Sequence, residues 1–263
     1  NGHQQFCSQD EVIYHELLVH VPMSLAPGRQ RVLILGGGDG LALRDVLRYG
    51  DVESVTLVDI DPAVVRLASE HPDLIRLNRA AFRDARVRAP EAHGVSPGEK
   101  MAVTARTKLA RQLVDQTEYS LAEVRVVTID ADLFLRDVGE SYDVAILDFP
   151  DPKNVELAKL YSVDFYRALA RRLAPDGIVS VQSTSPYQAK QVFLCIGRTL
   201  RAAGYRALPY QDHLPSFGDW GWHLAWRAAI TEAEMRNRLR HLSTLAVPTD
   251  YVTCETIDAA FVF

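Results

Sequence analysis

One stretch of the chain limits its possible folds more than any other: residues 31–40, with the sequence RVLILGGGDG. The apolar run from Val32 to Leu35 is typical of a buried parallel strand. Four glycines lie among the next five residues, and the residues from Leu41 to Tyr49 are predicted to form a helix. A strand, a glycine-rich turn and a helix N-terminus are the usual cradle for an adenosine-containing molecule.

This glycine turn also carries a carboxylate. Asp39 stands where the phosphates of a dinucleotide would approach the turn. Because two negative charges repel each other, the turn is expected to hold a cationic ligand instead.

Further strand and helix signals alternate along the chain. Predicted strands cover residues 54–58, 124–129, 144–147 and 178–181, and predicted helices cover 63–70, 163–173, 188–203 and 232–242. Pro62 suits the first position of a helix, and Thr231 with Glu234 forms a capping box. The alternation predicts an α/β fold of the Rossmann-like type, with a doubly wound and mostly parallel sheet.

Three parts are expected along the chain. Residues 1–24 are interpreted as a truncated N-terminal β-hairpin segment, with a strand at 3–7, and a helix that runs from Asp10 toward Pro22. Residues 25–230 form the Rossmann-like domain, and residues 231–263 form a C-terminal helix and tail. Residues from about 89 to 123 contain several Pro and Gly and are interpreted as an insertion, either a surface excursion or a lid or subunit contact.

Composition excludes several classes of protein. The net charge is −5 and no basic run is present, so nucleic acid is not an expected partner. The three cysteines are scattered, which fits neither a disulfide framework nor a zinc site and favours a reducing, cytoplasmic compartment. No apolar run is long enough to span a bilayer. Because the chain opens without Met, we expect it to be part of a longer protein.

Acidic residues follow several of the predicted strands. Asp59 follows the second strand, where a carboxylate can accept hydrogen bonds from both ribose hydroxyls of an adenosine. Asp130, followed by Ala131, is placed either to meet an adenine edge or to cap a helix. Asp148 and Asp151 lie on a proline-rich loop after a later strand. So many carboxylates in one cleft require cations as partners.

Other polar residues give weaker signals. Tyr14 and His15 lie on a predicted helix before the first strand, where packing is the commoner role for such residues. No pair of histidines has the spacing of a metal site, so no metal is expected. His20, His71, His93 and His241 are interpreted as surface residues.

In combination, these motifs resemble the spermidine synthase (polyamine aminopropyltransferase) family. The resemblance covers most of residues 4–187 apart from the insertion. It rests on these motifs, in order: Gln5, Asp10-Glu11, Tyr14-His15-Glu16, Gly36 to Gly40, Asp59-Ile60-Asp61, Asp148 with Asp151-Pro152, Leu160-Tyr161, Phe165-Tyr166, Leu173 to Gly177, and Gln182. The stretches 40–44 and 214–218 are most similar to the bacterial branch in which this domain is fused to a membrane-embedded N-terminal region.

The resemblance implies the class I AdoMet-dependent transferase fold and the transfer of an aminopropyl group. The donor would be decarboxylated AdoMet, the acceptor a polyamine such as putrescine, and the products spermidine and methylthioadenosine, with no tightly bound cofactor. It implies Asp148 and Tyr14 as catalytic residues. The implied donor-binding residues are Gln5, Gly36, Gly38, Asp39, Asp59, Asp130 and Ala131, and the implied amine-binding residues are His15, Asp151 and Gln182. It also implies a homodimer or a higher oligomer.

The sequence departs from the family pattern near the acceptor side. Phe217 stands where the family commonly has a Tyr, and Lys153 adds a cation beside the implied amine channel. Two other functions remain open at this point: a methyltransferase that uses intact AdoMet, and a nucleoside- or polyamine-binding domain without catalysis. Asp39 and the Asp148/Asp151 pair fit an ammonium ligand better than the carboxylate of intact AdoMet.

Overall fold

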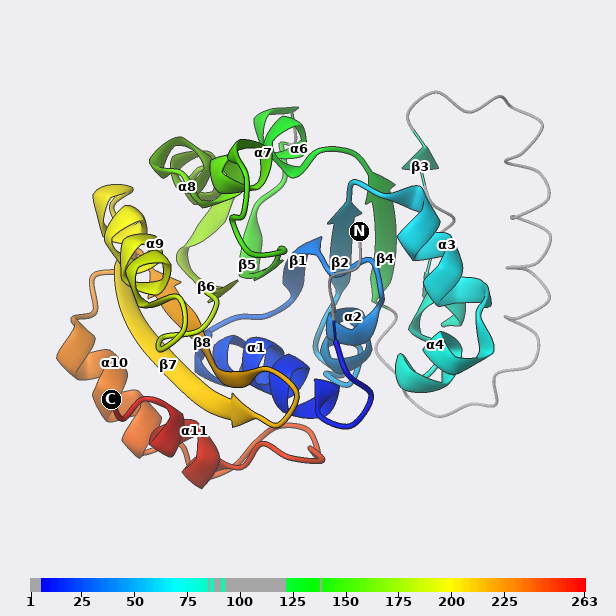
Figure 1. Cartoon of the computed structure of the whole chain (residues 1–263). Helices are drawn as coiled ribbons and strands as arrows, with labels where there is room; N and C mark the ends of the chain where they lie inside the picture. Colours follow the sequence, from blue (N-terminus) through cyan, green and yellow to red (C-terminus); the bar gives the residue numbers. More distant parts are fainter. Residues whose placement is uncertain (1–5, 85, 88–90, 93–121, 138) are drawn as a thin grey trace.

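The computed structural model describes residues 6–84, 86–87, 91–92, 122–137 and 139–263. One sheet runs through the molecule, with strand order β3-β4-β2-β1-β5-β6-β8-β7 (Figure 1). The strands are β1 (Arg31–Gly36), β2 (Ser54–Asp59), β3 (Glu91–Ala92), β4 (Glu123–Thr128), β5 (Tyr142–Asp148), β6 (Leu173–Gln182), β7 (Arg206–Leu214) and β8 (Gly218–Trp226). The predicted α/β class is confirmed.

The central strands are parallel, and their register brings the acidic residues to one edge. β1 pairs with β2 on one side and with β5 on the other, so that Gly36 lies opposite Asp148. β2 pairs with β4, which places Asp59 opposite Thr128. Since parallel strands all end at the same edge of the sheet, the glycine turn, Asp59 and Asp148 converge there.

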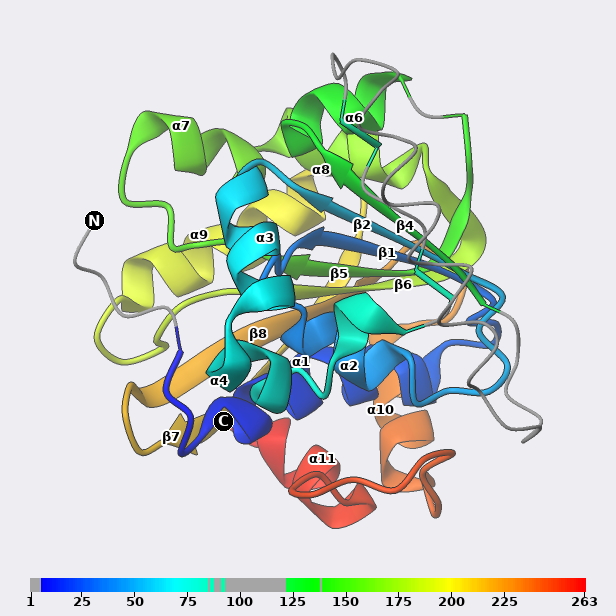
Figure 2. The same ribbon diagram turned by 90° about the vertical axis from the view of Figure 1, so that its right-hand side faces the viewer.

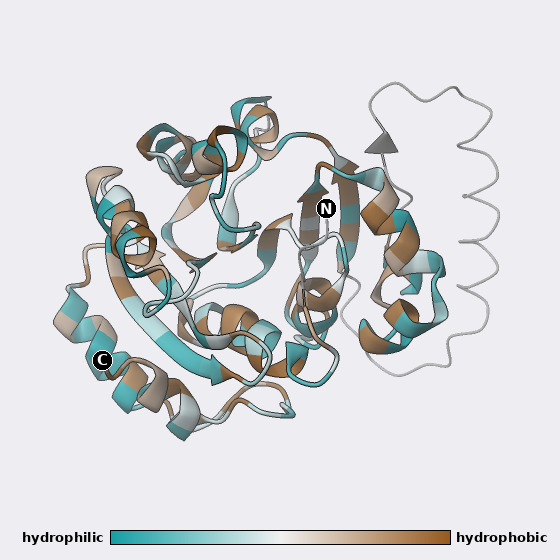
Figure 3. Ribbon diagram, viewed as in Figure 1, coloured by the Kyte–Doolittle hydropathy of each residue, from teal (hydrophilic) through white to brown (hydrophobic). Residues whose placement is uncertain are grey.

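Helices cover both faces of the sheet (Figures 1 and 2). They are α1 (Glu11–Leu25), α2 (Leu41–Val46), α3 (Pro62–Glu70), α4 (Pro72–Leu77), η1 (Ala81–Arg83), α6 (Ala131–Asp137), α7 (Val155–Ala158), η2 (Lys159–Tyr161), α8 (Val163–Ala170), α9 (Lys190–Ala202), α10 (Glu232–Arg240) and α11 (Cys254–Ala260). α1, α2, α10 and α11 share one buried apolar cluster with the sheet, and α6, α8 and α9 share a second on the opposite face. Figure 3 shows the hydrophobic residues along the central strands.

An antiparallel pair of strands extends the sheet beyond the sequence-based prediction. β8 pairs antiparallel with both β6 and β7. No strand was predicted for residues 206–226, because β7 and β8 lack the strand–helix alternation that marks the other strands. Trp222 and Trp226 of β8 are completely buried, which makes this hairpin part of the core.

Four local predictions were wrong. α1 continues through Pro22 to Leu25, because a proline inside a helix removes one backbone hydrogen bond without necessarily ending it. The predicted helix at 163–173 ends at Ala170, and the Pro175-Asp176-Gly177 segment belongs to β6. No strand includes Phe6 or Cys7, and the rest of the expected hairpin lies outside the described residues. His20 is completely buried, with Nδ1 2.9 Å from the hydroxyl of Tyr49.

The three-part division of the chain stays a prediction. Most of the expected insertion, with His93, lies outside the described residues. Of its ends, Glu91–Ala92 pairs with β4 as the edge strand β3, and Glu123 opens β4 itself. No helix in the described part of the chain combines the length and the apolar composition that a membrane crossing requires.

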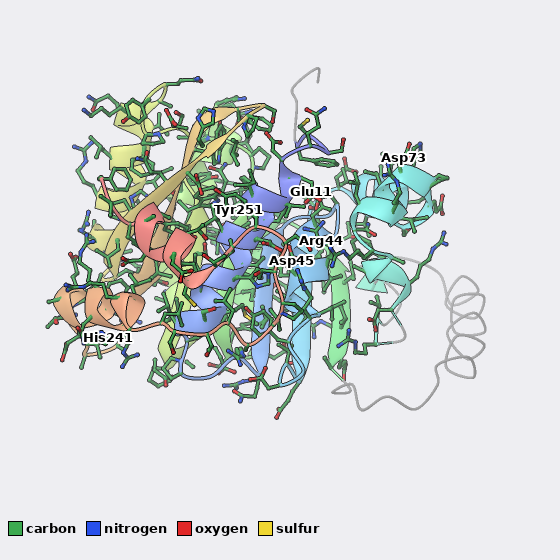
Figure 4. All side chains as sticks on the ribbon, turned by 90° about the horizontal axis from the view of Figure 1, so that it is seen from below. Glu11, Arg44, Asp45, Asp73, His241 and Tyr251 are labelled. Atoms are coloured by element: carbon green, nitrogen blue, oxygen red, sulfur yellow. The ribbon has the colours of Figure 1, made fainter. Side chains whose placement is uncertain are left out.

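A buried carboxylate fastens the C-terminal segment to α1. Glu16 is 1% exposed and accepts hydrogen bonds from the backbone amides of Asp250, Tyr251 and Val252, each at 2.8 Å. Arg48 of the neighbouring segment donates to the same carboxylate at 3.2 Å. Figure 4 shows Tyr251 beside α1. The contact therefore holds the helix that carries Tyr14 and His15 against the end of the chain.

We expect Glu16→Gln to lower the free energy of unfolding by about 3 kcal/mol, because three backbone amides and an arginine lose the negative charge of a buried partner. Urea denaturation measures this loss. Asp51→Asn is the matched control, since Asp51 also binds an arginine, Arg29, but is 48% exposed, and we expect less than about 1 kcal/mol for it. Equal losses for the two variants would contradict the anchoring role of Glu16.

Candidate active site

A short hydrogen bond joins a tyrosine of α1 to the carboxylate at the end of β5. The hydroxyl of Tyr14 donates to Oδ1 of Asp148 at 2.6 Å. Burial, together with the negative charge of Asp148, raises the pKa of Tyr14 well above its usual value. At neutral pH the phenol therefore keeps its proton and holds the carboxylate in a fixed orientation.

The glycine turn approaches both acidic strand ends closely. Gly36 has φ +84°, and a Cβ atom there would lie 2.2 Å from the backbone oxygen of Asp148. A Cβ on Gly38 would lie 2.6 Å from Oδ2 of Asp59, and the backbone N–H of Gly38 donates to that oxygen at 2.8 Å. The predicted glycine cradle is thus packed directly on Asp148 and Asp59.

We expect Gly36→Ala to destabilise the fold by about 3 kcal/mol, because the new Cβ combines left-handed backbone strain with a clash against backbone. Gly50→Ala is the control, since a Cβ there meets no atom within 4 Å. Thermal unfolding of both variants measures the difference. A Gly36 variant as stable as the Gly50 variant would show that the turn does not pack as described.

Asp39 lies beside Asp148 at the end of the turn. Its Oδ1 accepts a hydrogen bond from the amide of Leu41 at 2.9 Å. Burial raises the pKa of Asp39 to about 6; the charge of Asp148 adds to this shift, and the nearby His15 opposes it. At neutral pH Asp39 is therefore a half-buried carboxylate close to a second one.

His15 contributes a positive charge to the same place. Its Nδ1 donates to the carbonyl oxygen of Glu11 at 2.7 Å, and its Nε2 lies 3.8 Å from Oδ2 of Asp148. Burial lowers the pKa of His15, but the contact with Glu11 and the charges of Asp39 and Asp148 outweigh it and raise the pKa to about 9.

The three side chains could in principle surround a metal ion. His15, Asp39 and Asp148 each offer one ligand atom, and these atoms lie within 4.8 Å of one another. A metal would have to displace the proton of His15, whose pKa is raised to about 9. The two carboxylates of the cluster suit a cationic ligand.

Asp59 is held by backbone amides on both oxygens. Asp61 donates to Oδ1 at 2.8 Å and Gly38 donates to Oδ2 at 2.8 Å. Burial raises the pKa of Asp59, and these two hydrogen bonds oppose the shift. Each oxygen keeps a further lone pair, so the side chain can still accept hydrogen bonds from two vicinal hydroxyls.

Asp130 is placed differently from the other candidates. Its Oδ1 accepts from the amide of Asp132 at 2.8 Å at the start of α6, and its Oδ2 binds Nζ of Lys159 at 2.6 Å. Burial would raise the pKa of Asp130, but the bond to Lys159 and the helix amides lower it. The side chain is a helix cap with its own cation. Ala131 is buried as the first residue of α6.

Asp151 and Gln182 form a separate contact next to this cluster. The side-chain amide of Gln182 donates to the carbonyl oxygen of Phe149 at 2.7 Å and to Oδ1 of Asp151 at 3.1 Å. The hydroxyl of Tyr161 donates to the same carbonyl at 3.1 Å, which fixes the loop between the two acids. Nζ of Lys153 lies 4.0 Å from Asp151.

The structure therefore gathers most of the candidate residues, though not all of them. Tyr14, His15, Asp39 and Asp148 form one cluster, which we call the ammonium site. Gly36, Gly38 and Asp59 border it. Gln5 lies outside the described residues. No role was predicted for Glu11 or Tyr161, although both belong to the motifs shared with the family.

Comparison with known proteins identifies the family. The sequence profile of the spermine/spermidine synthase domain matches residues 11–95 and 100–237. The chain is 41% identical over 263 residues to polyamine aminopropyltransferase 2 of Ralstonia nicotianae and 36% identical over 269 residues to the polyamine aminopropyltransferase of Shewanella oneidensis. It belongs to the spermine/spermidine synthase family.

The coverage of these relatives is one-sided. The alignments span 100% of this chain but 43% of the Ralstonia protein and 41% of the Shewanella protein. The chain thus spans about two fifths of the length of these two relatives.

Solved structures agree on the fold. A spermidine synthase in complex with the transition state analogue AdoDATO superposes with a TM-score of 0.72, at 24% identity, over 97% of this chain and 73% of that one. Spermidine synthase from Thermotoga maritima gives a TM-score of 0.69 at 23% identity, over 97% of this chain and 72% of that one. At this level of identity the likeness establishes the shared fold.

Proposed function

We propose that this chain is the catalytic domain of a polyamine aminopropyltransferase, which moves the aminopropyl group of decarboxylated AdoMet to an amine such as putrescine. The observation that carries the proposal is the ammonium site: Tyr14 bonded to Asp148 at 2.6 Å, with Asp39 and His15 in the same cluster. No arginine or lysine among the described residues forms an ion pair with Asp39 or Asp148. Among the described residues, the cation next to Asp148 is His15, so a net negative charge remains at the site for a cationic substrate.

The reaction needs a base and an alignment. The lone pair of the acceptor nitrogen forms a bond to the terminal methylene of the aminopropyl group, the carbon–sulfur bond breaks, and its electron pair stays on sulfur as the neutral thioether methylthioadenosine. An alkylammonium has a pKa near 10 and must lose a proton before it can attack. Asp148 accepts this proton, and the hydrogen bond from Tyr14 orients the carboxylate of Asp148. The sulfonium of the donor is already a good leaving group, so the protein contributes mainly by aligning the nitrogen, carbon and sulfur atoms in one line.

The donor would extend along the sheet edge. Asp59 would accept the ribose hydroxyls through the free lone pairs described above, and the glycine turn would pass beneath the nucleoside. Asp39 would bind the ammonium of the aminopropyl arm. Intact AdoMet would bring its carboxylate to this acidic pocket, which is the physical basis for preferring the decarboxylated donor.

The side chains proposed to bind the nucleobase and the amine already have hydrogen-bond partners within the protein. Asp130 would reach the adenine edge only with Lys159 displaced or as a joint partner, because both oxygens of Asp130 are occupied. Gln5 would complete the nucleoside side. On the amine side, His15, Asp151 and Gln182 would line the path of the acceptor beyond Asp148.

An assay with purified protein tests the proposal. The protein is incubated with decarboxylated AdoMet or AdoMet against putrescine, cadaverine and spermidine, and methylthioadenosine is measured by chromatography. We expect release of methylthioadenosine with the decarboxylated donor and an amine. Methylation with intact AdoMet would identify a methyltransferase, and binding without turnover of any pair would identify a non-catalytic domain.

The setting of the reaction is part of the same proposal. We expect catalysis in the cytoplasm, where the free thiols of Cys7, Cys195 and Cys254 would stay reduced. A homodimer or higher oligomer and attachment to a membrane-embedded region are also expected, and the mass of the native protein in detergent tests both.

A further inference from the structure

We propose that Glu11 is a positioning residue of this site: it orients the His15 ring and keeps it positively charged between Asp39 and Asp148. The inference builds on the proposed aminopropyl transfer, and it assigns a purpose to a buried acid that does not touch the substrates in that mechanism.

The geometry fixes the histidine ring from one side. The backbone carbonyl of Glu11 accepts the Nδ1 hydrogen at 2.7 Å, and Oε2 of the same residue lies 3.2 Å from Nδ1. Glu11 and His15 are 3% and 2% exposed, so water does not replace either contact. With Nδ1 held in this way, Nε2 faces the ammonium site, 3.8 Å from Asp148.

Glu11 itself is anchored by a guanidinium. Nη1 of Arg44 donates to Oε1 of Glu11 at 2.8 Å, while Nη2 of Arg44 binds Asp45 at 2.9 Å. Figure 4 shows Glu11, Arg44 and Asp45 together beneath the sheet. One oxygen of Glu11 is thus paired with Arg44. The other, Oε2, has no hydrogen-bond partner in the described part of the chain, and the cation next to it is the imidazole of His15.

The charges around His15 explain what this anchoring achieves. Glu11 and Tyr14 face the ring from α1, Asp39 from the glycine turn and Asp148 from the end of β5. When His15 is charged, the sum over Asp39, Asp148 and His15 is a net charge of −1. This matches the single positive charge of one ammonium group. A neutral His15 would leave two adjacent carboxylates uncompensated, and like charges at this separation favour uptake of a proton. Since His15 now lowers the pKa of Asp39, loss of its charge would raise that pKa above 6.

The test compares Glu11→Gln with wild type by two measurements. NMR titration of the His15 ring, assigned with a His15→Gln variant, should give a pKa near 9 in the wild type and a value in the ordinary histidine range in Glu11→Gln. The acidic limb of the kcat/KM profile should move from about 6 to a higher pH, which lowers kcat/KM at pH 7 severalfold. Activity should recover above the shifted limb, whereas a merely structural defect lowers it at every pH.

Asp45→Asn is the matched control, because Asp45 is equally buried and binds the same Arg44 but does not contact His15. Its His15 titration and acidic limb should match the wild type. An ordinary pKa for His15 in the wild-type protein would overturn the proposal even without any variant. An unchanged titration in Glu11→Gln, or a limb that moves equally in Asp45→Asn, would also overturn it. The NMR result does not depend on turnover, so it is distinguishable from a failure of the proposed function.

Discussion

We expect replacement of Asp148 by Asn to lower kcat for the proposed aminopropyl transfer by about a thousandfold, the range expected when a positioned general base is removed. Asn keeps the size of the side chain and can still accept the hydrogen bond that Tyr14 donates to Asp148 at 2.6 Å. It cannot take a proton from the attacking amine. Single-turnover assays with decarboxylated AdoMet and putrescine measure the effect on the chemical step.

The same variant should bind methylthioadenosine as the wild type does, since the nucleoside hydroxyls are expected on Asp59 and not on Asp148. Calorimetry with methylthioadenosine provides this control. Asp164→Asn, at a side chain that is 93% exposed on α8, should change neither quantity. Turnover by the Asp148 variant at the wild-type rate would show that Asp148 is not the catalytic base.

The second large effect is on donor choice. We expect Asp39→Asn to reduce the preference for decarboxylated AdoMet over AdoMet by about a hundredfold, because the variant no longer attracts the ammonium or repels the extra carboxylate. Competition between the two donors, measured by thermal stabilisation or by calorimetry, gives the ratio.

The role of Asp39 also has a pH signature. With a pKa of about 6, Asp39 gains a proton as the pH falls through 6, and the neutral form loses its attraction for ammonium. Binding of the decarboxylated donor should therefore weaken below pH 6 in the wild type and stay level in Asp39→Asn. If the variant kept the wild-type donor ratio and the wild-type pH profile, Asp39 would have no part in donor recognition.

The central part of this site could be predicted because it follows from local pattern and topology. The apolar run before Gly36 and those before Asp59 and Asp148 each predict a strand, and parallel strands bring their carboxyl ends to one edge. The register confirms that Gly36 and Asp148 are direct neighbours. Asp39 and Asp148, two of the acidic residues expected to share one cleft, lie together without an arginine or lysine partner in the described part of the chain.

Other features of the fold and of the site depend on long-range contacts, which sequence patterns do not reveal. Asp130 binds Lys159, 29 residues away, and no local signal distinguishes that ion pair from an open adenine site. His20 is buried by packing against Tyr49, which its helical position alone does not reveal. In the β7–β8 hairpin, Trp222 stacks on Tyr210 of the neighbouring strand, a pairing that forms only once the register is set.

Glu11 shows the same limit at the site itself. Its partner Arg44 lies 33 residues further along the chain, on a helix that packs against α1 only in the folded protein. The sequence placed Glu11 in the family pattern, but the arrangement that joins Arg44, Glu11 and His15 exists only in three dimensions. The charge state of His15 therefore required the structure.

A crystal structure of this protein with methylthioadenosine and putrescine tests the central claim, one acidic slot for two cationic substrates placed end to end, most directly. The account predicts the ribose hydroxyls on Asp59 and one putrescine nitrogen at about 2.6–3.2 Å from Asp148 or Tyr14, in line with the sulfur. A diamine bound away from Asp39 and Asp148, or a nucleoside whose sulfur points away from them, would contradict it.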